Sequence, residues 1–472
     1  METWQSPMDW AQAQFGGCRL GDKRRTSRLV LVGCSMLSRS SASIPKQMHS
    51  LAAVKAAYRL FGTEDVTHEA ICAPHWESTR ALARLPDQGL VLFVQDQTEL
   101  NFGPKPDSYG LGFTSNTRGR GIEVQTNLCV IADLTGAERP EVLGIAFQAP
   151  WLRTHAPRKN IETANERSKR GTEYDAWEES VAAIGSAPAP GSGTTWVSVG
   201  DRAGDVFEHL FTATELGWRC LIRSKHDRTL QGSAGPGRLH QMARSLEPMG
   251  ATSISLRSRP AVKGDALRRS RPAREARTVV LNLAYFPARI KGSRKAGKHR
   301  VLDLTCIRAW EAPSVPPVAE PIEWLLLTTL QVDSLSDALL AVRLYRERWL
   351  VEEYHKCLKT GCRMEKRDLN HASKLLALLG VLSIVAVFLL QLKTPNPLTQ
   401  PPDELIRLVR RITQAKEDLG KPSALLRRIA MLGGFLGRKA DGEPGWQTIW
   451  DGWTRLQDII WGTELAEAMR CG

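Results

Sequence analysis

A run of eighteen residues without charge, LLALLGVLSIVAVFLLQL at positions 375–392, places the strongest constraint on how this chain can fold. The run is just long enough to span a bilayer as a helix, so it must lie either in a membrane or in the core of a large domain. Gly380, Ser383 and Gln391 weaken the membrane interpretation, and the sequence holds no second run of this kind. We therefore predict a buried core helix and no membrane partner.

Four chemically distinct side chains recur at helical spacing in the segment YRERWLVEEYHKCLK, residues 345–359. They are a hydroxyl, a guanidinium, a carboxylate and an ammonium group, carried by Tyr345, Arg348, Glu352 and Lys359. In one continuous helix with about 100° per residue, these side chains share an arc of about 60°. Charged residues at this spacing often form only i,i+4 ion pairs, so the stripe alone is equally consistent with a solvent-exposed face.

Two isolated aspartates upstream favour a catalytic interpretation. Asp96 ends the apolar run LVLFVQD and Asp201 ends the run WVSVGD, and both runs are predicted to be strands. An α/β fold presents catalytic groups at the ends of its strands. Spacing alone does not show that these aspartates meet Glu352, because acidic residues are common in the chain. Arg202 and Asp205 follow Asp201 and are expected to orient the site rather than to bind a metal.

Three carboxylates are suited to a pair of hard divalent cations, which prefer oxygen ligands. Two cations held about 3.5–4 Å apart can activate an attacking water or hydroxyl and stabilise the leaving oxygen of a phosphoryl displacement. The remaining residues of the stripe would then be directed at neighbouring phosphates: Tyr345, Arg348 and Lys359. The sequence contains no histidines at ligand spacing, no G-x-S-x-G elbow and no dinucleotide-binding loop after a strand.

The charge balance indicates a polyanionic partner. The chain has 64 Lys and Arg residues against 50 Asp and Glu residues, which gives a formal net charge of +14. Nucleic acid is the favoured partner and a membrane surface is the alternative. A helix that Asp22 can cap carries four cations in its first two turns, where they oppose the helix dipole: Lys23, Arg24, Arg25 and Arg28. We interpret this cluster as phosphate-binding, with a solvated basic face as the alternative.

The chain is too long for one compact core, so several domains are expected. The first seventy residues are predicted to be helical, and a helix at 50–61 would place Leu51, Val54, Tyr58 and Phe61 on its apolar side. A mixed α/β pattern follows, with a basic, β-rich insertion, and the C-terminal part is again helical. There, an aromatic stripe at near-helical spacing is typical of a core or an oligomer interface: Trp446, Trp450, Trp453, Leu456, Ile460 and Trp461.

The cysteines and the N-terminus predict a cytoplasmic protein. Nine cysteines are scattered without the paired spacing of a zinc site or a disulfide framework, so they are expected to be buried, reduced thiols. The first residues, METWQSPMDW, do not resemble an export signal.

The segment 345–359 also resembles the Y-(2)-R-(3)-E-(6)-K signature of the insertion-sequence-four (IS-four) group of bacterial DDE cut-and-paste transposases, and specifically its Tn-five-like branch. The resemblance keeps the order of the family through nearly the whole chain and is weakest at about 230–300. The other matching stretches are LGDKRRTSRL, AYRLF, the Asp96 strand, GDRAGD, IRSKH, EWLLLT and MLGGF.

The resemblance implies a three-domain organisation. An RNase H-like catalytic domain is expected at 69–371, interrupted by a β-rich insertion at about 220–330. A helical DNA-end-binding domain at 1–68 would precede it, and a helical dimerisation domain at 372–472 would follow it.

The resemblance also implies roles for individual residues. Asp96, Asp201 and Glu352 match the DDE triad, which is expected to hold two Mg²⁺ ions, with Mn²⁺ as a substitute. Residues that match phosphate contacts in the family are Tyr345, Arg348, Lys359, Arg223 and Lys225. Trp324 matches a tryptophan that stacks on a flipped-out base. The residues that match the end-binding arm of the family are Lys23, Arg24, Arg25 and Arg28.

The implied function is cut-and-paste transposition by a homodimer that bridges two transposon ends. One metal site would nick the end, form a hairpin, open it and join the 3′-hydroxyl to target DNA, on the bacterial nucleoid in the cytoplasm. Two alternatives stay open: a plain nuclease of the same fold, which would not need Trp324, and a non-catalytic DNA-binding regulator derived from a transposase.

Overall fold

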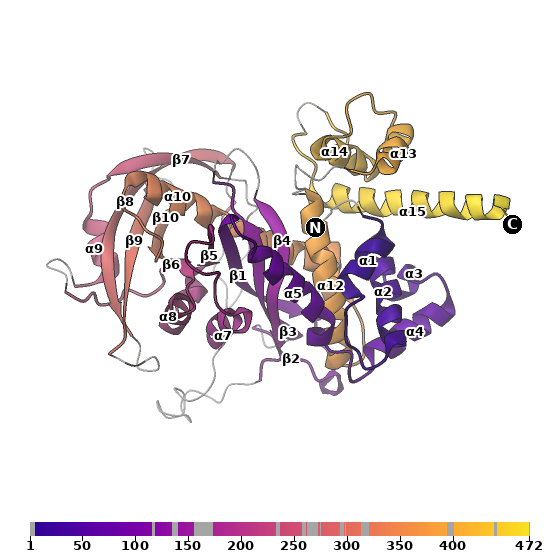
Figure 1. Ribbon diagram of the computed structural model, residues 1–472, viewed down its shortest axis with the longest axis horizontal. Helices are drawn as coiled ribbons and strands as arrows, with labels where there is room; N and C mark the ends of the chain where they lie inside the picture. The colour runs from indigo at the N-terminus through magenta and orange to yellow at the C-terminus, as the bar shows by residue number, and fades with distance from the viewer. Residues whose placement is uncertain are drawn as a thin grey trace.

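Helices form both ends of the computed structural model, and a large sheet forms its middle (Figure 1). The structure describes residues 5–115, 119–134, 140–154, 173–232, 237–256, 261, 272–273, 275–292, 297, 299–312, 321–393, 401–438 and 441–471. Part of the basic segment at about 230–300 therefore lies outside the described residues. The N-terminal helices are α1 (Pro7–Phe15), α2 (Lys23–Ser38), α3 (Ile44–Gln47), α4 (Leu51–Phe61) and α5 (His68–Ala83).

Polar side chains fix where the N-terminal helices begin. The side chain of Asp22 accepts a hydrogen bond from the backbone N–H of Arg24 and caps α2. Ser50 caps α4 and Thr67 caps α5 in the same manner. The predicted helices at 23–37 and 50–61 are confirmed.

The predicted apolar face of α4 is partly wrong. Leu51 and Tyr58 are exposed, whereas Ala57, Leu60 and Phe61 are buried. Helices α2 and α12 (Ala372–Lys393) pack against α4. They cover the stripe that ends at Leu60 and Phe61, so the edge of the apolar face remains in solvent.

The sheet has ten strands in the order β2-β3-β1-β5-β6-β10-β9-β8-β7, and β4 pairs with β3. The pairs β1–β5 and β5–β6 are parallel, and the other pairs are antiparallel. The strands are β1 (Gly89–Asn101), β2 (Gly112–Phe113), β3 (Arg120–Ile131), β4 (Glu141–Trp151), β5 (Thr194–Gly200), β6 (Arg219–Arg223), β7 (Gly250–Leu256), β8 (Arg277–Lys291), β9 (Val301–Glu311) and β10 (Glu323–Thr328). The predicted mixed α/β class is confirmed. The insertion strands do not form a separate sheet, because β10 pairs directly with β6.

Each face of the sheet buries its own core. Alternate residues of a strand point to opposite faces, and β1 accordingly sends Leu92 and Val94 into one cluster and Val91 and Phe93 into the other. The second cluster lies under α7 (Asp175–Ile184) and α8 (Phe207–Glu215). The first lies under α12, so even-numbered residues of β1 in this stretch face α12.

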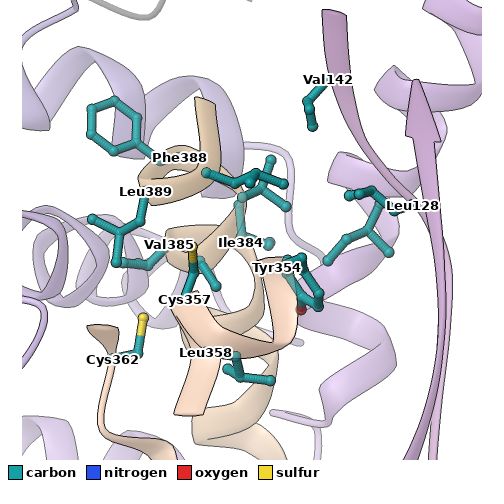
Figure 2. Close-up of a cluster of buried hydrophobic side chains, with 14 of the residues drawn as sticks. Leu128, Val142, Tyr354, Cys357, Leu358, Cys362, Ile384, Val385, Phe388 and Leu389 are labelled. Atoms are coloured by element: carbon teal, nitrogen blue, oxygen red, sulfur yellow. The ribbon is translucent and has the colours of Figure 1, made fainter. Parts of the chain in front are cut away.

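Helix α12 confirms the prediction of a buried core helix, because 94% of its most apolar window is buried. It packs on α5 and β4 on one side and on α2 and α4 on another. Figure 2 shows four of its residues, Ile384, Val385, Phe388 and Leu389, among buried side chains from other parts of the chain. The helix thereby joins the N-terminal helices to the sheet.

The remaining helices lie between the strands or after the last of them along the chain. They are α9 (Leu239–Ser245), α10 (Leu335–Arg346), α11 (Trp349–Lys356), α13 (Asp403–Thr413), α14 (Pro422–Leu432) and α15 (Trp446–Cys471), with single helical turns at η1 (Asp107–Tyr109), η2 (Arg202–Gly204), η3 (Cys357–Gly361) and η4 (Met364–Lys366). The predicted aromatic stripe lies on α15, and its first part is core: Trp446, Trp450, Trp453 and Leu456 are buried. Residues 461–470 are exposed along their whole length, and the end of α15 projects from the body of the protein (Figure 1).

Eight cysteines have described side chains, and all eight are free thiols. Seven of them are buried as predicted, and Cys34 is partly exposed.

Candidate active site

Two parallel neighbouring strands bring Asp96 and Asp201 together. Gln95 of β1 is the register partner of Gly200 of β5. The two aspartates are the next residues on their strands, so they lie side by side where the parallel pairing stops. Asp201 directly follows β5, as predicted. The prediction that Asp96 also ends its strand is wrong, because β1 continues to Asn101 in its pairing with β3.

The segment 345–359 is not one helix, so the prediction of a single helical stripe is wrong. Helix α10 ends at Arg346 and α11 begins at Trp349. Between them the backbone N–H of Arg348 donates to the carbonyl of Tyr345, an i→i−3 bond that tightens the chain into a turn. Lys359 then lies in a π-helical turn, η3. Packing on the sheet, rather than helical periodicity, decides where the four side chains meet.

The pKa of Asp96 is influenced by both of the other predicted catalytic carboxylates, Asp201 and Glu352. Burial, and then repulsion from Asp201 and Glu352, raises the pKa of Asp96 to about 7, although Arg348 and the N–H of Gln97 oppose the shift. One carboxylate raises the pKa of another only when the two are close together and poorly screened by solvent. The structure therefore gathers Asp96, Asp201 and Glu352 in one region.

Glu352 is held by a cation of its own helix turn. The guanidinium Nη2 of Arg348 donates to Glu352 Oε1 at 2.5 Å. Burial would lower the pKa of Arg348, but Tyr345 and Glu352 outweigh it and hold that pKa above its usual value. Within the described ranges, no three His, Cys, Asp or Glu side chains are gathered closely enough to hold a metal ion. The three carboxylates have the oxygen ligands that a divalent cation prefers, but in this structure Glu352 is paired with Arg348.

Two further groups lie beside this site. His355 of α11 places Nδ1 3.9 Å from Asp96 Oδ2. Burial and the nearby Lys359 lower the pKa of His355 to about 3, so the imidazole is neutral. Lys359 donates from Nζ to the backbone carbonyl of Glu99 at 2.7 Å, which ties the π-helical turn to β1.

A basic and aromatic wall borders the carboxylates. Arg223 at the end of β6 donates to the carbonyl of Glu323 at 2.8 Å. Burial lowers the pKa of Arg223, and Tyr345, Arg348 and Asp201 are close enough to influence it. Trp324, the second residue of β10, packs edge-to-face on Tyr345 with ring centroids 5.4 Å apart. The structure therefore places Arg223, Tyr345 and Trp324 next to the carboxylates.

Lys225 lies farther along the same wall. Its Nζ donates to the hydroxyl of Tyr174 at 3.1 Å and lies 4.7 Å from the centre of that ring. It lines a cavity of about 610 Å³ together with Phe207 and Lys291. Within the described residues, these contacts of Lys225 do not involve the three carboxylates.

Asp205 organises the loop that carries Lys225. The carboxylate of Asp205 is buried and accepts hydrogen bonds from the backbone N–H groups of Lys225 at 2.6 Å and His226 at 2.9 Å. It also forms an ion pair with Arg228. These bonds occupy the Asp205 carboxylate with contacts inside the protein, as expected for a residue that orients the site and does not bind a metal.

The basic cluster on α2 is separate from this site, because α12 lies between α2 and the sheet (Figure 1). The guanidinium of Arg24 reaches back to its capping residue Asp22 at 2.9 Å and is 93% exposed. Arg25 pairs with Asp65 at 2.5 Å, so this cation also has a structural partner. Lys23 is exposed and Arg28 is partly exposed.

Sequence reasoning assigned no role to several buried polar residues near the site. Gln148, Tyr354 and His355 are all buried and all lie close to α11 or Asp96. The only signal in the sequence was the presence of Tyr354 and His355 inside the 345–359 segment.

Three family models match the chain. Residues 7–66 match a model described as Transposase DNA-binding, and residues 393–471 match the Transposase Tn5 dimerisation domain. Residues 146–388, more than half of the chain, match the Transposase DDE domain. That match includes Asp201 and Glu352, whereas Asp96, on β1, lies before the matched region.

Proposed function

Because the chain belongs to the DDE transposases of the Tn5 family, with DNA-binding, catalytic and dimerisation domains, we propose that it performs cut-and-paste transposition through a hairpin intermediate. It nicks each transposon end, forms and opens a hairpin, and transfers the freed strand into target DNA. One observation carries this proposal: Asp96 and Asp201 are neighbours where the parallel pairing of β1 and β5 stops, and burial, with repulsion from Asp201 and Glu352, raises the pKa of Asp96.

Membership of the DDE family implies a divalent metal. We assign Asp96, Asp201 and Glu352 as the ligands of two Mg²⁺ ions, which Mn²⁺ can replace, because three crowded carboxylates repel one another until a cation neutralises them. When bound, such a pair of ions would activate the attacking water or 3′-hydroxyl and stabilise the leaving oxygen. Glu352 must leave Arg348 to become a ligand.

The release of Arg348 supplies a phosphate-binding group at the same moment. A guanidinium can bind a phosphate through two parallel hydrogen bonds, and Arg348 lies one helix turn before Glu352 on the chain. Arg223 and Tyr345 border the same space. We propose that these three groups, with Lys359 and Lys225 on either side, hold the phosphates that flank the reacting bond.

The proposed hairpin step depends on Trp324. Its ring is partly exposed and packs edge-to-face with Tyr345, so part of the indole is accessible to a base. Stacking of a base on an aromatic ring contributes about 1–3 kcal/mol. Trp324→Ala should therefore slow conversion of the nick to the hairpin about tenfold, while Trp324→Phe retains most of the rate.

This prediction is checked by following a labelled, pre-nicked end on a denaturing gel under single-turnover conditions. First-strand nicking of an intact end should stay within about threefold of the native rate. Equal loss of nicking and hairpin formation would contradict a role specific to the flipped base.

The other domains complete the proposal. We assign end recognition to residues 1–68 through Lys23, Arg24, Arg25 and Arg28, because α2 presents these cations away from the catalytic sheet. The catalytic domain would comprise 69–371, with its insertion at about 220–330. Residues 372–472 would join two copies into a homodimer on paired inverted repeats, on the nucleoid in the bacterial cytoplasm. Binding that neutralises many phosphates should weaken steeply with salt.

The test of the function uses a linear DNA fragment that carries the terminus and flank of the element. Incubation with the protein and Mg²⁺ should give a nick at the boundary and then a hairpin on a denaturing gel, and EDTA should abolish both products. Nicks without hairpins would indicate a plain nuclease. Retarded DNA without any cleavage, in Mg²⁺ and in Mn²⁺, would indicate a non-catalytic regulator.

A further inference from the structure

Gln148 of β4 is the centre of a buried hydrogen-bond network. Its side chain is 1% exposed. The amide oxygen accepts from His68 Nε2 at 2.9 Å and from the hydroxyl of Ser383 at 2.7 Å. The amide nitrogen donates to Thr126 Oγ1 and to the hydroxyl of Tyr354, both at 3.0 Å. All four hydrogen bonds that a glutamine side chain can form are therefore made inside the protein.

The network lies in one row with Asp96. Asp96 is the register partner of Thr126 on β3, and Thr126 is the partner of Gln148 on β4. Residues directly opposite each other on antiparallel strands point to the same face of the sheet. The row Asp96, Thr126, Gln148 therefore runs across three strands on the face that α11 and α12 cover.

Helix α11 contributes to both ends of this row. Glu352 and His355 lie near Asp96, and Tyr354 reaches Gln148. The Tyr354 hydroxyl also hydrogen-bonds to Ser383 of α12. In Figure 2, Tyr354 lies between Ile384 of α12 and Leu128 of β3.

The other contacts that hold α11 and the following turn η3 on the sheet and on α12 are mainly apolar, from Val351 of α11 and from Cys357 and Leu358 of η3. Apolar contacts have no direction, so they allow a helix to slide or rotate over a smooth surface. A buried hydroxyl with defined partners opposes this movement, because displacement would break the hydrogen bond between Tyr354 and Gln148 and leave one buried amide hydrogen of Gln148 without an acceptor.

We propose that the Gln148–Tyr354 contact is a positioning device, which fixes the rotation of α11 and thereby keeps Glu352 on the side of the helix from which it can join Asp96 and Asp201 as a ligand of a divalent cation. Gln148 and Tyr354 touch neither metal nor DNA and act only through Glu352. This inference rests on the proposed function, since it assigns the metal to these carboxylates.

The test compares Mn²⁺ binding, measured by electron paramagnetic resonance, with single-turnover nicking. Tyr354→Phe removes only the hydroxyl, and Gln148→Met removes the whole network at nearly constant volume. Groups that orient metal ligands typically change affinity by about 10–100-fold when they are replaced. Both variants should therefore bind Mn²⁺ about tenfold more weakly and nick more slowly, and they should bind the DNA end as the native protein does. Higher Mn²⁺ should restore much of the nicking rate.

Gln391→Met is the matched control. Gln391 is also a buried glutamine on this face, and its amide donates to the carbonyl of Val142 at 2.8 Å, which ties α12 to β4 without contacting α11. It should lower the melting temperature as Gln148→Met does but leave Mn²⁺ binding unchanged. Native Mn²⁺ affinity in Tyr354→Phe, or an equal loss in Gln391→Met, would overturn the positioning role.

Failure of the proposed function gives a different result. Suppose that the native protein binds Mn²⁺, that Asp96→Asn does not, and that the native protein cleaves no DNA. This result would refute transposition, but the comparison of Tyr354→Phe with Gln391→Met would still test the positioning role. A native protein that binds no Mn²⁺ at this site would refute both.

Discussion

Replacing Glu352 with glutamine should lower the rate of strand nicking by at least about 10³-fold and leave binding of the DNA end unchanged. The substitution keeps the shape of the side chain but removes the negative charge, and divalent cations bind carboxylates far better than amides. The ion pair with Arg348 at 2.5 Å is lost as well. Because that pair is partly exposed and lies within one helix turn, its loss should cost only about 0.5 kcal/mol of stability.

Nicking is measured with a 5′-labelled end fragment on a denaturing gel, and binding is measured by gel retardation. Glu353→Gln is the matched control, because Glu353 is the next residue of α11 and lies close to Glu347 instead of Asp96. This variant should nick within about threefold of the native rate. If Glu352→Gln retained a tenth of the native activity, the assignment of Glu352 as a metal ligand would be wrong.

The two strand aspartates show how far sequence can locate this site. Central strands buried on both faces appear as continuous apolar runs, so the runs before Asp96 and Asp201 were recognisable. The end of β1 was misplaced because the strand continues past the last residue that β5 pairs with, through Gln97 and Glu99 to Asn101. Along that extension β1 has lost its pairing with β5 and is paired with β3 on one edge, so polar residues are tolerated there and the apolar signal ends.

Helical spacing failed at the signature segment for a different reason. Helix α10 packs on β6 and β8, whereas α11 packs on β1 and β3. A turn at residues 347–348 lets each helix follow its own part of the sheet. The side-chain pattern of one segment does not show that its two halves pack on different strands, so it does not predict a break between two helices.

The hydrogen-bond network around Gln148 could not be predicted from the sequence either. A glutamine within an apolar strand gives no sign of its partners, and these lie at positions 68, 126, 354 and 383. Only the folded chain brings them together. The burial of α12, in contrast, followed directly from its length and lack of charge, because a soluble protein can place such a helix only in its core.

The raised pKa of Asp96 predicts that nicking at limiting Mg²⁺ falls steeply below about pH 7. Burial and repulsion by Asp201 and Glu352 favour the protonated form, and a proton must leave before Asp96 can bind a cation. The rate should therefore fall about tenfold for each pH unit below 7, or about 100-fold at pH 5. Since Mg²⁺ competes with the proton, raising Mg²⁺ tenfold should move the midpoint to lower pH.

The same shift predicts how Asp96→Asn changes stability without metal. The pKa in the folded protein, about 7, lies above the unfolded value near 3.8. The stabilisation from the protonated carboxyl is therefore complete below pH 3.8 and is lost as pH rises to about 7. The amide that replaces the carboxyl cannot ionise. The free energy of unfolding of the variant should therefore rise relative to that of the native protein through this pH window, by at most about 4 kcal/mol at pH 8.

Thermal unfolding in EDTA at pH 5 and pH 8 measures this gain, and gel retardation over the same range tests whether DNA binding explains the loss of rate. Both effects have one cause, because the crowded carboxylates that destabilise the metal-free protein are the groups that attract the cation. A midpoint that stays fixed as Mg²⁺ is raised, together with equal melting temperatures for Asp96→Asn and the native protein at pH 8, would show that Asp96 is not under this repulsion. The metal site would then have to be sought elsewhere.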